Sequence, residues 1–448
     1  MVESTKGTVR LESPIGVPLE VAFDAGRLTS DGGLPWLGEA DRALGLCDRL
    51  ADCIPDWRQR VVRHSVTTLV RQRVYQIACG YADQNDAATL RTDPLLKLVC
   101  GRRPVSGATL ASQPTLSRLE NAVDRHAIEA LAATLVEVYI AQRSPGGAPR
   151  RLLLDLDGTA DPAHGEQEGV RYHGYYRQHM YHPLLVFDGD TGQLITAVLR
   201  PGNVHASRFV VLVLRRLLRR VRAAWPDVAL EIRADSGFAV PRLYAWCEVN
   251  AVTYTIGLIP NPSLESLAAP LLEEAHRQSE AQRGAKVRLA GEDRYQAKTW
   301  PHLRRIIFKA EVLIKGPNTR FVVTTRDDDP LALYDFYVDR GDAENRIKDF
   351  KNALAGDRLS DHRFWANAFR LLLHAAAFWL LDTLRRWLAT TEAAAYQFDT
   401  LRLRLLKIGG RVRELTDRIR LSLASSHPGE PLWLALAQRP LRPVNNPG

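Results

Sequence analysis

The chain has 448 residues, of which 46% are hydrophobic and 25% charged, so its composition is that of a globular protein large enough for two to four structural units. Its formal net charge of +9 favours a polyanionic partner over a small neutral ligand, although an arginine-rich codon usage would give the same excess. The five cysteines include no CxxC pair, which excludes a zinc module or a disulfide framework.

No segment is predicted to enter a membrane. The N-terminus lacks the basic-then-apolar pattern of a signal peptide. The longest apolar run, residues 371–381, is too short to span a bilayer and contains a histidine, so we predict a buried helix there. These features indicate a cytoplasmic protein.

Residues 1–142 are predicted to form a mainly helical region. The segments VVRHSVTTLVRQRVYQIACGY and DRHAIEALAATLVEVYIAQ both repeat apolar residues at helical spacing. Between them, Ser112 is placed to cap a helix and Pro114 lies near its first turn, which predicts a recognition helix that exposes Gln113 and Arg118. A plain surface helix is the alternative, because helix-turn-helix signals in a single sequence are weak.

After a short linker, the pattern changes to that of an α/β fold. RLLLDLDGT, HPLLVFDGD and LITAVLRPG are predicted to form a three-strand meander, and VALEIRADSGF and VTYTIGL are two further strands that alternate with helices. Right-handed crossovers would add these two strands in parallel, which puts the first and fourth strands side by side in a mixed sheet. The predicted regions are a helical region at 1–142, a linker at 143–150, a core at 151–259 and 332–360, a β-rich insertion at 260–331, and a C-terminal region at 361–448 with helices to about residue 420 and then a loosely ordered tail.

Two aspartates end the adjacent strands of this predicted sheet. Asp157 follows the first strand and Asp235 the fourth, so their carboxylates are expected at the same edge, where Glu344 could reach them from a later helix. Taken singly, Asp157 could serve only a turn and Asp235 only a helix cap. Three close carboxylates repel one another unless hard divalent cations such as Mg²⁺ neutralise them. Two such ions about 3.5–4 Å apart can activate water against a phosphodiester.

The segment YVDRGDAENRIKDFK carries a polar stripe. Tyr337, Arg340, Glu344 and Lys351 lie at offsets of 0, 3, 7 and 14, which complete whole helical turns and place the four side chains on one face. An amphipathic helix normally repeats apolar residues on such a face. The stripe is therefore either a solvated ladder of salt bridges or the lining of a site.

These residues resemble those of a known family. The spacing from Tyr337 to Lys351 resembles the Y-R-E-K signature of DDE transposases of bacterial insertion sequences, which have an RNase H-like catalytic core. DLDGT resembles their first-aspartate strand and IRADSGF their second. Further stretches across residues 20–390 are similar to insertion-sequence family 1380: RLTSDGG, RQRVYQIACGYADQNDA, ASQPTLSRLEN, DPAHGEQEG, LRPGNVHASRF and DRLSDHRFWANAFRLLLHAAA.

The resemblance implies that Asp157, Asp235 and Glu344 are the catalytic residues and hold two Mg²⁺ (or Mn²⁺) ions. Asp155 lies two residues before Asp157 on the same strand face, so either aspartate could be the first ligand. The D-x-T context favours Asp157, with Asp155 assisting it or bracing the strand end.

The resemblance also implies contacts with DNA along the polar stripe, where cations would hold phosphates over the metals. A tryptophan in the insertion would stack on an extruded base, although core packing is equally open for it. The implied or predicted DNA-binding residues are Tyr337, Arg340, Lys348, Lys351, Trp300, Gln113 and Arg118. Weaker candidates, for which a structural role is as plausible, are Asn203, His205, His164 and Gln167.

We therefore expect a DNA transposase that binds the terminal inverted repeats of its element, cleaves the DNA at the ends, and joins the 3′-hydroxyl ends to target DNA. Its partner would be double-stranded DNA, and cutting two ends predicts a homodimer on paired ends in the bacterial nucleoid. The alternatives are an RNase H-like nuclease without strand transfer and an inactive, transposase-derived DNA-binding protein.

Overall fold

In the computed structural model, residues 3–5, 8–58, 62–313 and 316–439 are described. The chain divides into two compact units. The first comprises Met1–Ala51, Asp56–Leu119 and Leu380–Gly448, and the second comprises Asp52–Pro55 and Glu120–Trp379. The C-terminal segment, which we predicted as a separate region, thus groups with the N-terminal helices.

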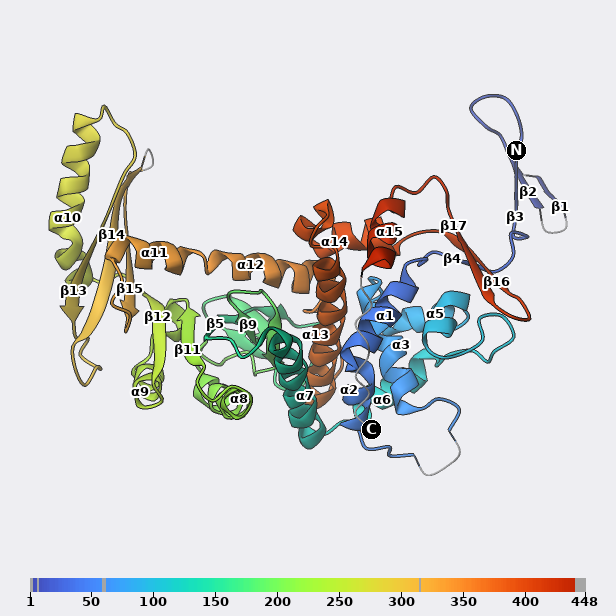
Figure 1. Cartoon of the computed structure of the whole chain (residues 1–448), viewed down its shortest axis with the longest axis horizontal. Coiled ribbons are helices and arrows are strands. Elements are labelled where there is room, and N and C mark those ends of the chain that lie inside the picture. The colour runs from blue at the N-terminus through green and yellow to red at the C-terminus, as the bar shows by residue number, and fades with distance from the viewer. Residues whose placement is uncertain (1–2, 6–7, 59–61, 314–315, 440–448) are drawn as a thin grey trace. The chain divides into compact units, whose positions relative to one another are not determined.

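The second unit is built on an eight-stranded mixed sheet (Figure 1) with the order β10-β9-β5-β11-β12-β15-β14-β13. β5 pairs in parallel with β11, which pairs in parallel with β12, while β9 and β10 continue antiparallel on the other side of β5. The predicted RNase H-like mixed sheet, with its first and fourth strands adjacent, is confirmed. The strands are β5 (Arg151–Gly158), β9 (Leu184–Asp188), β10 (Leu194–Val198), β11 (Ala229–Ala234), β12 (Val252–Leu258), β13 (Val287–Tyr295), β14 (Arg304–Leu313) and β15 (Gly316–Thr324).

The predicted insertion is part of this same sheet. Strand β15 pairs antiparallel with β12, and β14 and β13 follow, so the three strands extend the core sheet instead of forming a sheet of their own. We did not predict β13, whose sequence VRLAGEDRY is polar on its exposed side. Helix α10 (Pro262–Ala281) packs against β13 and β14.

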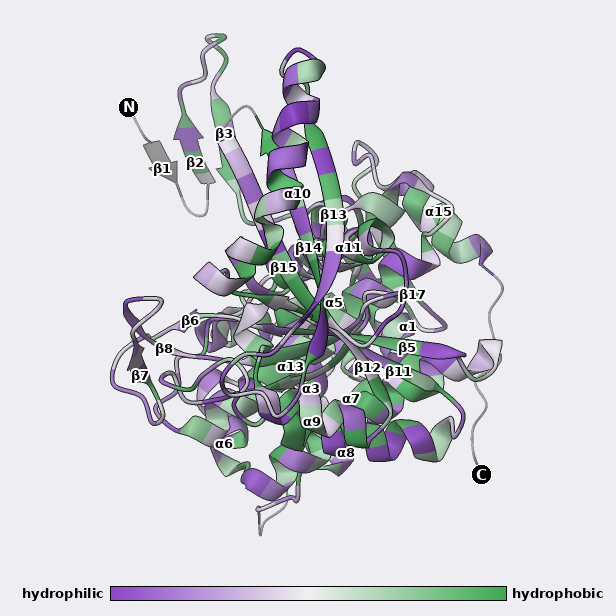
Figure 2. Ribbon diagram, turned by 90° about the vertical axis from the view of Figure 1, so that its left-hand side faces the viewer, coloured by the Kyte–Doolittle hydropathy of each residue, from purple (hydrophilic) through white to green (hydrophobic). Residues whose placement is uncertain are grey.

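Continuous apolar runs explain the central strands. Every residue of β9 is buried, and β5 buries the run from Leu152 to Leu156, as expected for strands covered on both faces. The crossover helices α8 (Val210–Ala224) and α9 (Pro241–Val249) link the parallel strands. Most leucines and valines of α8 are buried and alternate along the helix with its arginines, which gives the helix the green and purple bands of Figure 2.

The segment that carries the polar stripe is not one helix. It forms α11 (Pro330–Val338) and α12 (Gly341–Lys348), followed by a π-helical turn at Asp349–Ala353. Between the two helices, Arg340 N donates to Tyr337 O, an i+3 bond typical of a tight turn. The single helix that we predicted from Tyr337 to Lys351 is therefore wrong, and Gly341, a poor helix former, begins the second piece.

The first unit combines helices with two small sheets. The C-terminal segment forms β16 (Gly410–Glu414) and β17 (Ile419–Leu423), where we predicted helix to about residue 420. Strand β16 also pairs with β4 (Leu28–Thr29), nearly four hundred residues earlier, and such a distant partner has no local signal. The other elements are β1 (Glu3–Thr5), β2 (Thr8–Leu11), β3 (Leu19–Ala22), α1 (Leu34–Leu44), α2 (Leu46–Asp52), α3 (Val66–Ala78), α4 (Ala87–Leu90), α5 (Pro94–Val99), α14 (Phe398–Leu401) and α15 (Glu430–Gln438).

Helix α13 (Phe364–Trp387) is the one described helix that is long and apolar enough to cross a membrane. Its most apolar stretch is 89% buried within the protein, as in the core helix of a globular protein. The predicted buried helix at residues 371–381 is confirmed. Helices α6 (Gln113–Ala122) and α7 (Arg125–Arg143) precede the core, and a small sheet of β6 (Asp161–Pro162), β7 (Arg171–His173) and β8 (Gln178–Tyr181) follows β5.

Candidate active site

Asp157 and Asp235 lie at the ends of neighbouring parallel strands. The pairing between β5 and β11 ends at Leu156 and Ala234. Asp157 is the next residue of β5, where it pairs with Leu185 of β9, and Asp235 directly follows β11. Asp235 also caps a short 3₁₀ turn, because its Oδ1 accepts a hydrogen bond from the backbone N–H of Gly237 at 2.9 Å. The cap that we considered as an alternative role is thus present, and it orients the carboxylate at the sheet edge.

Arg340 links this edge to the polar stripe. Its Nη1 lies 3.2 Å from Oδ2 of Asp157, and its Nη2 lies 3.1 Å from Oε1 of Glu344. The side chains of Asp157 and Arg340 are mostly buried, whereas that of Glu344 is 56% exposed. One guanidinium therefore connects a carboxylate of the sheet to a carboxylate of α12.

The charges at this edge interact strongly. Burial raises the pKa of Asp157 to about 7, and the nearby carboxylates of Asp235 and Glu344 contribute to this rise against the opposing effect of Arg340. Burial disfavours the charged form of Arg340, but Tyr337 and the surrounding carboxylates raise its pKa overall. A carboxyl group whose pKa is raised to near neutral pH is typical of functional sites.

The donor chemistry of the edge suits a hard divalent cation, because Asp157, Asp235 and Glu344 offer only carboxylate oxygens. In the described ranges, no group of three or more His, Cys, Asp or Glu side chains has the spacing to hold a metal ion. Arg340 instead supplies the positive charge between Asp157 and Glu344.

A buried ion pair lies one layer below the two aspartates. Arg233 donates from Nε and Nη2 to the two carboxylate oxygens of Asp155, at 2.7 and 2.9 Å, and both residues are almost fully buried. Its remaining Nη1 donates to the backbone carbonyl of Phe336 in α11 at 2.6 Å. Arg233 therefore connects both aspartate-bearing strands to α11, which contains Tyr337 and ends two residues before Arg340. We did not predict this role for Arg233. An arginine in a strand of mostly apolar residues, two positions before Asp235, is a sequence signal for it.

The other two residues of the stripe, Tyr337 and Lys351, and the nearby Lys348 occupy different surroundings. Tyr337 is half-buried, and its pKa is raised by burial. Lys351 donates to the carbonyl of Ala160 at 2.6 Å, in the loop that follows β5, so it holds that loop in place. Lys348 is exposed and lies 3.4 Å from Oδ1 of Asn345.

The chain matches the sequence profile described as "Transposase DDE domain group 1" over residues 14–444, nearly its whole length. It belongs to this family of DDE transposases. No match was found among curated proteins. Among solved structures, the piggyBac transposase synaptic complex with hairpin DNA is 11% identical, with 85% of this chain and 80% of that chain covered and a TM-score of 0.41.

Trp300 lies in the core of the β13–β15 region and is only 6% exposed. Its ring packs edge-on against Tyr244 and Tyr295, and the guanidinium of Arg304 lies 5.3 Å from it. Core packing, the alternative that we left open, describes these surroundings. Stacking on a base stays a prediction and requires the indole to leave this packing.

The predicted recognition helix exists as α6, with Gln113 at its first position and Arg118 exposed. The two residues are five positions apart, which is about 140° around the helix axis, so they do not share one face. Their contacts with DNA remain a prediction.

The weaker candidates hold loops together. Gln167 donates to the carbonyls of Leu359 and Asp361, and its Oε1 accepts from the N–H of His164. The turn that contains Asn203 and His205 is organised by the buried Arg200. That guanidinium donates to the carbonyls of His182, Pro183, Ala206 and Arg208.

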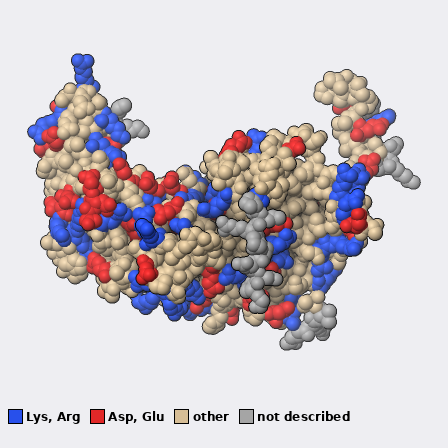
Figure 3. All heavy atoms as spheres, in the orientation of Figure 1, with Lys and Arg blue, Asp and Glu red and all other residues tan. Residues whose placement is uncertain are grey.

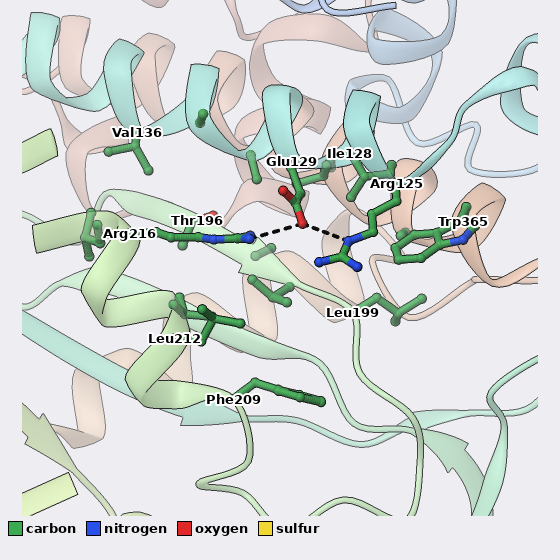
Figure 4. Close-up of a pocket in the computed structure, with 18 of the residues that line it drawn as sticks. Arg125, Ile128, Glu129, Val136, Thr196, Leu199, Phe209, Leu212, Arg216 and Trp365 are labelled. Carbon is green, nitrogen blue, oxygen red and sulfur yellow. Dashed lines mark hydrogen bonds and ion pairs between the residues drawn. The ribbon is translucent and has the colours of Figure 1, made fainter. Parts of the chain in front are cut away.

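An apolar cavity of about 430 Å³ lies elsewhere in the second unit, among α7, α8, β10 and the start of α13 (Figure 4). Glu129 lines it and forms ion pairs with Arg125 and Arg216. No residue of the predicted site lines this cavity, and its apolar walls do not suit phosphate chemistry.

Proposed function

We propose that this DDE transposase cleaves DNA at the ends of its own insertion sequence and joins the 3′-hydroxyl ends to target DNA. The observation that carries the proposal is the position of Asp157 and Asp235 at adjacent strand ends, linked through Arg340 to Glu344. The Y-R-E-K spacing supports a transposase of a bacterial insertion sequence, and stretches such as RLTSDGG and ASQPTLSRLEN support a place in insertion-sequence family 1380. Double-stranded DNA would be the partner, bound by a homodimer on paired ends in the bacterial cytoplasm.

Asp157, Asp235 and Glu344 would hold Mg²⁺ or Mn²⁺ ions, which when bound supply an activated water and stabilise the leaving oxygen of a phosphodiester. Arg340 would move its ion pairs from carboxylates to a DNA phosphate, because a guanidinium binds both kinds of oxyanion in the same fork geometry. Because its pKa is about 7, Asp157 is partly protonated at neutral pH, and it would lose this proton when a cation binds. The exposed Lys348 would contact the DNA backbone.

The test is an excision assay with a marker flanked by the gene's own flanking DNA, with and without Mg²⁺. Glu344→Gln is expected to abolish release of the marker and to leave binding to the flanking DNA intact. Asp342→Asn, which removes an exposed carboxylate from the same helix, is the matched control and should cut normally. Normal excision by Glu344→Gln would refute the proposed ligand.

An inactive DNA-binding protein is the second candidate. It is favoured by one observation, the pairing of Arg340 with both Asp157 and Glu344. Binding to the flanking DNA without metal-dependent release of the marker by the unmodified protein would support this candidate over the first.

A further inference from the structure

A polar cavity of about 290 Å³ opens in the first unit beside the start of α6. Among the described residues, three arginines line it and no carboxylate does. The lining residues are Arg58, Val62, Arg63, His64, Arg91, Thr109, Leu110, Ser112 and Thr115. Elsewhere, charges of both signs are interspersed over the face seen in Figure 3, so the net charge alone marks no binding surface.

Two of the three arginines keep their charge uncompensated. Arg58 forms a fork-like pair with Asp56, at 2.7 and 2.8 Å. Arg63 donates to the hydroxyl of Thr109 at 3.2 Å, and across the described chain no ion pair involves Arg63 or Arg91. Both side chains are exposed at the cavity and available to pair with an anion.

Hydrogen bonds from arginine side chains fix the backbone that forms the cavity wall. Arg58 donates to the backbone carbonyl of His64 at 2.6 Å, and Arg102 donates to that of Arg63 at 2.7 Å. His64 itself is buried, and burial together with Arg102, Arg63 and Arg58 lowers its pKa to about 4. The imidazole is therefore neutral at physiological pH, and the guanidiniums set a positive potential at the cavity.

Helix α6 adds hydrogen-bond donors to the same cavity. The hydroxyls of Ser112 and Thr115 line it, and the ten-residue helix begins there. The dipole of a helix N-terminus favours an anion. Arginine forks, hydroxyls and a helix start together match the oxygens of a phosphate.

We propose that this arginine pocket binds a backbone phosphate of duplex DNA and so seats the start of α6 on the double helix. The proposal rests on the proposed function, since it takes DNA as the partner. Phosphate contacts fix the register of a protein on DNA, whereas base contacts specify the sequence. The pocket would therefore orient α6, and with it the exposed Arg118, toward the groove.

The salt dependence of DNA binding by the full chain tests this assignment. Fluorescence anisotropy would measure the affinity for a duplex of the gene's flanking DNA and for an unrelated duplex over a range of salt. Each phosphate that the protein neutralises adds about 0.9 to the steepness of log K against log salt. We expect the slope to become shallower by that amount for Arg63→Gln and for Arg91→Gln, on both duplexes alike. Arg91→Lys keeps the charge and should keep the slope.

Arg42→Gln is the matched control, because it removes another exposed arginine, from α1 in the same unit, where it is paired with Glu39. Its slope should equal that of the unmodified protein. If Arg63→Gln and Arg91→Gln also keep that slope, or weaken binding to the flanking duplex alone, the phosphate assignment is overturned. If the unmodified protein binds neither duplex, the proposed function itself fails and this assignment falls with it.

Discussion

The buried pair of Asp155 and Arg233 allows a quantitative prediction. Arg233→Met removes the positive charge and keeps much of the volume, which leaves the fully buried carboxylate of Asp155 without its partner. Breaking a buried ion pair from one side costs about 3–5 kcal/mol. The carbonyl of Phe336 also loses its donor, which adds about 1 kcal/mol. We therefore expect the local stability of β5 and β11 to fall by at least about 3 kcal/mol at pH 8.

The loss should depend on pH. Burial raises the pKa of Asp155 even with Arg233 present, and removing the cation raises it further. A carboxyl group with a raised pKa in the folded state holds its proton more tightly there than in the unfolded chain. Folded stability therefore falls as the pH rises from the unfolded pKa to the folded pKa. The deficit of Arg233→Met should be smaller at pH 5 than at pH 8.

Native-state hydrogen exchange is the suitable assay, because a chain of two compact units has no single free energy of unfolding. The control is the double variant Asp155→Leu with Arg233→Met, which replaces the pair by apolar side chains and should recover most of the loss. A deficit below about 1 kcal/mol for Arg233→Met at pH 8, or no recovery in the double variant, would refute the reasoning.

Two further predictions concern buried positions near the site. Burial, with Asp357, raises the pKa of Asp161 to about 9 against the effect of Lys351, so Asp161 is protonated when folded at neutral pH. Asp161→Asn should raise the melting temperature at pH 8 and have little effect at pH 4, because the unfolded aspartate ionises near about pH 3.9; an equal effect at both values would contradict this. In Gly257→Ala, the new methyl group meets the hydroxyl of Tyr337 well inside contact distance, so the melting temperature should fall. Adding Tyr337→Phe leaves the ring carbon Cζ as its nearest neighbour at 3.2 Å and should restore most of the loss, whereas no rescue would mean that another atom blocks the methyl group.

Continuous apolar runs were enough to predict the central strands and their order. The runs of β5 and β11 are buried, and helix α8 leads the chain from β10 to β11, so a right-handed crossover places β11 parallel to and beside β5. Asp157 lies near the end of β5, and Asp235 directly follows β11. The C-terminal strands were mispredicted because β16 pairs with β4 from the other end of the chain, and GRVRELTDRIRLSL alone fits either a helix or a strand. Trp300 shows a similar limit, since an indole in a polar loop sequence gives no sign of the aromatic partners that bury it.

The choice between Asp155 and Asp157 shows why the site could not be completed from the sequence. A strand repeats its side-chain direction every two residues, so both aspartates share one face of β5 and periodicity cannot separate them. Arg233 separates them, because the same period places it two residues before Asp235, on the adjacent strand and opposite Asp155. Its guanidinium is satisfied by the carboxylate of Asp155 and the carbonyl of Phe336. Both carboxylate oxygens of Asp155 are therefore occupied by the ion pair that links the two strands. Asp157 lies at the sheet edge with Asp235, and for this reason we propose Asp157 as the first ligand.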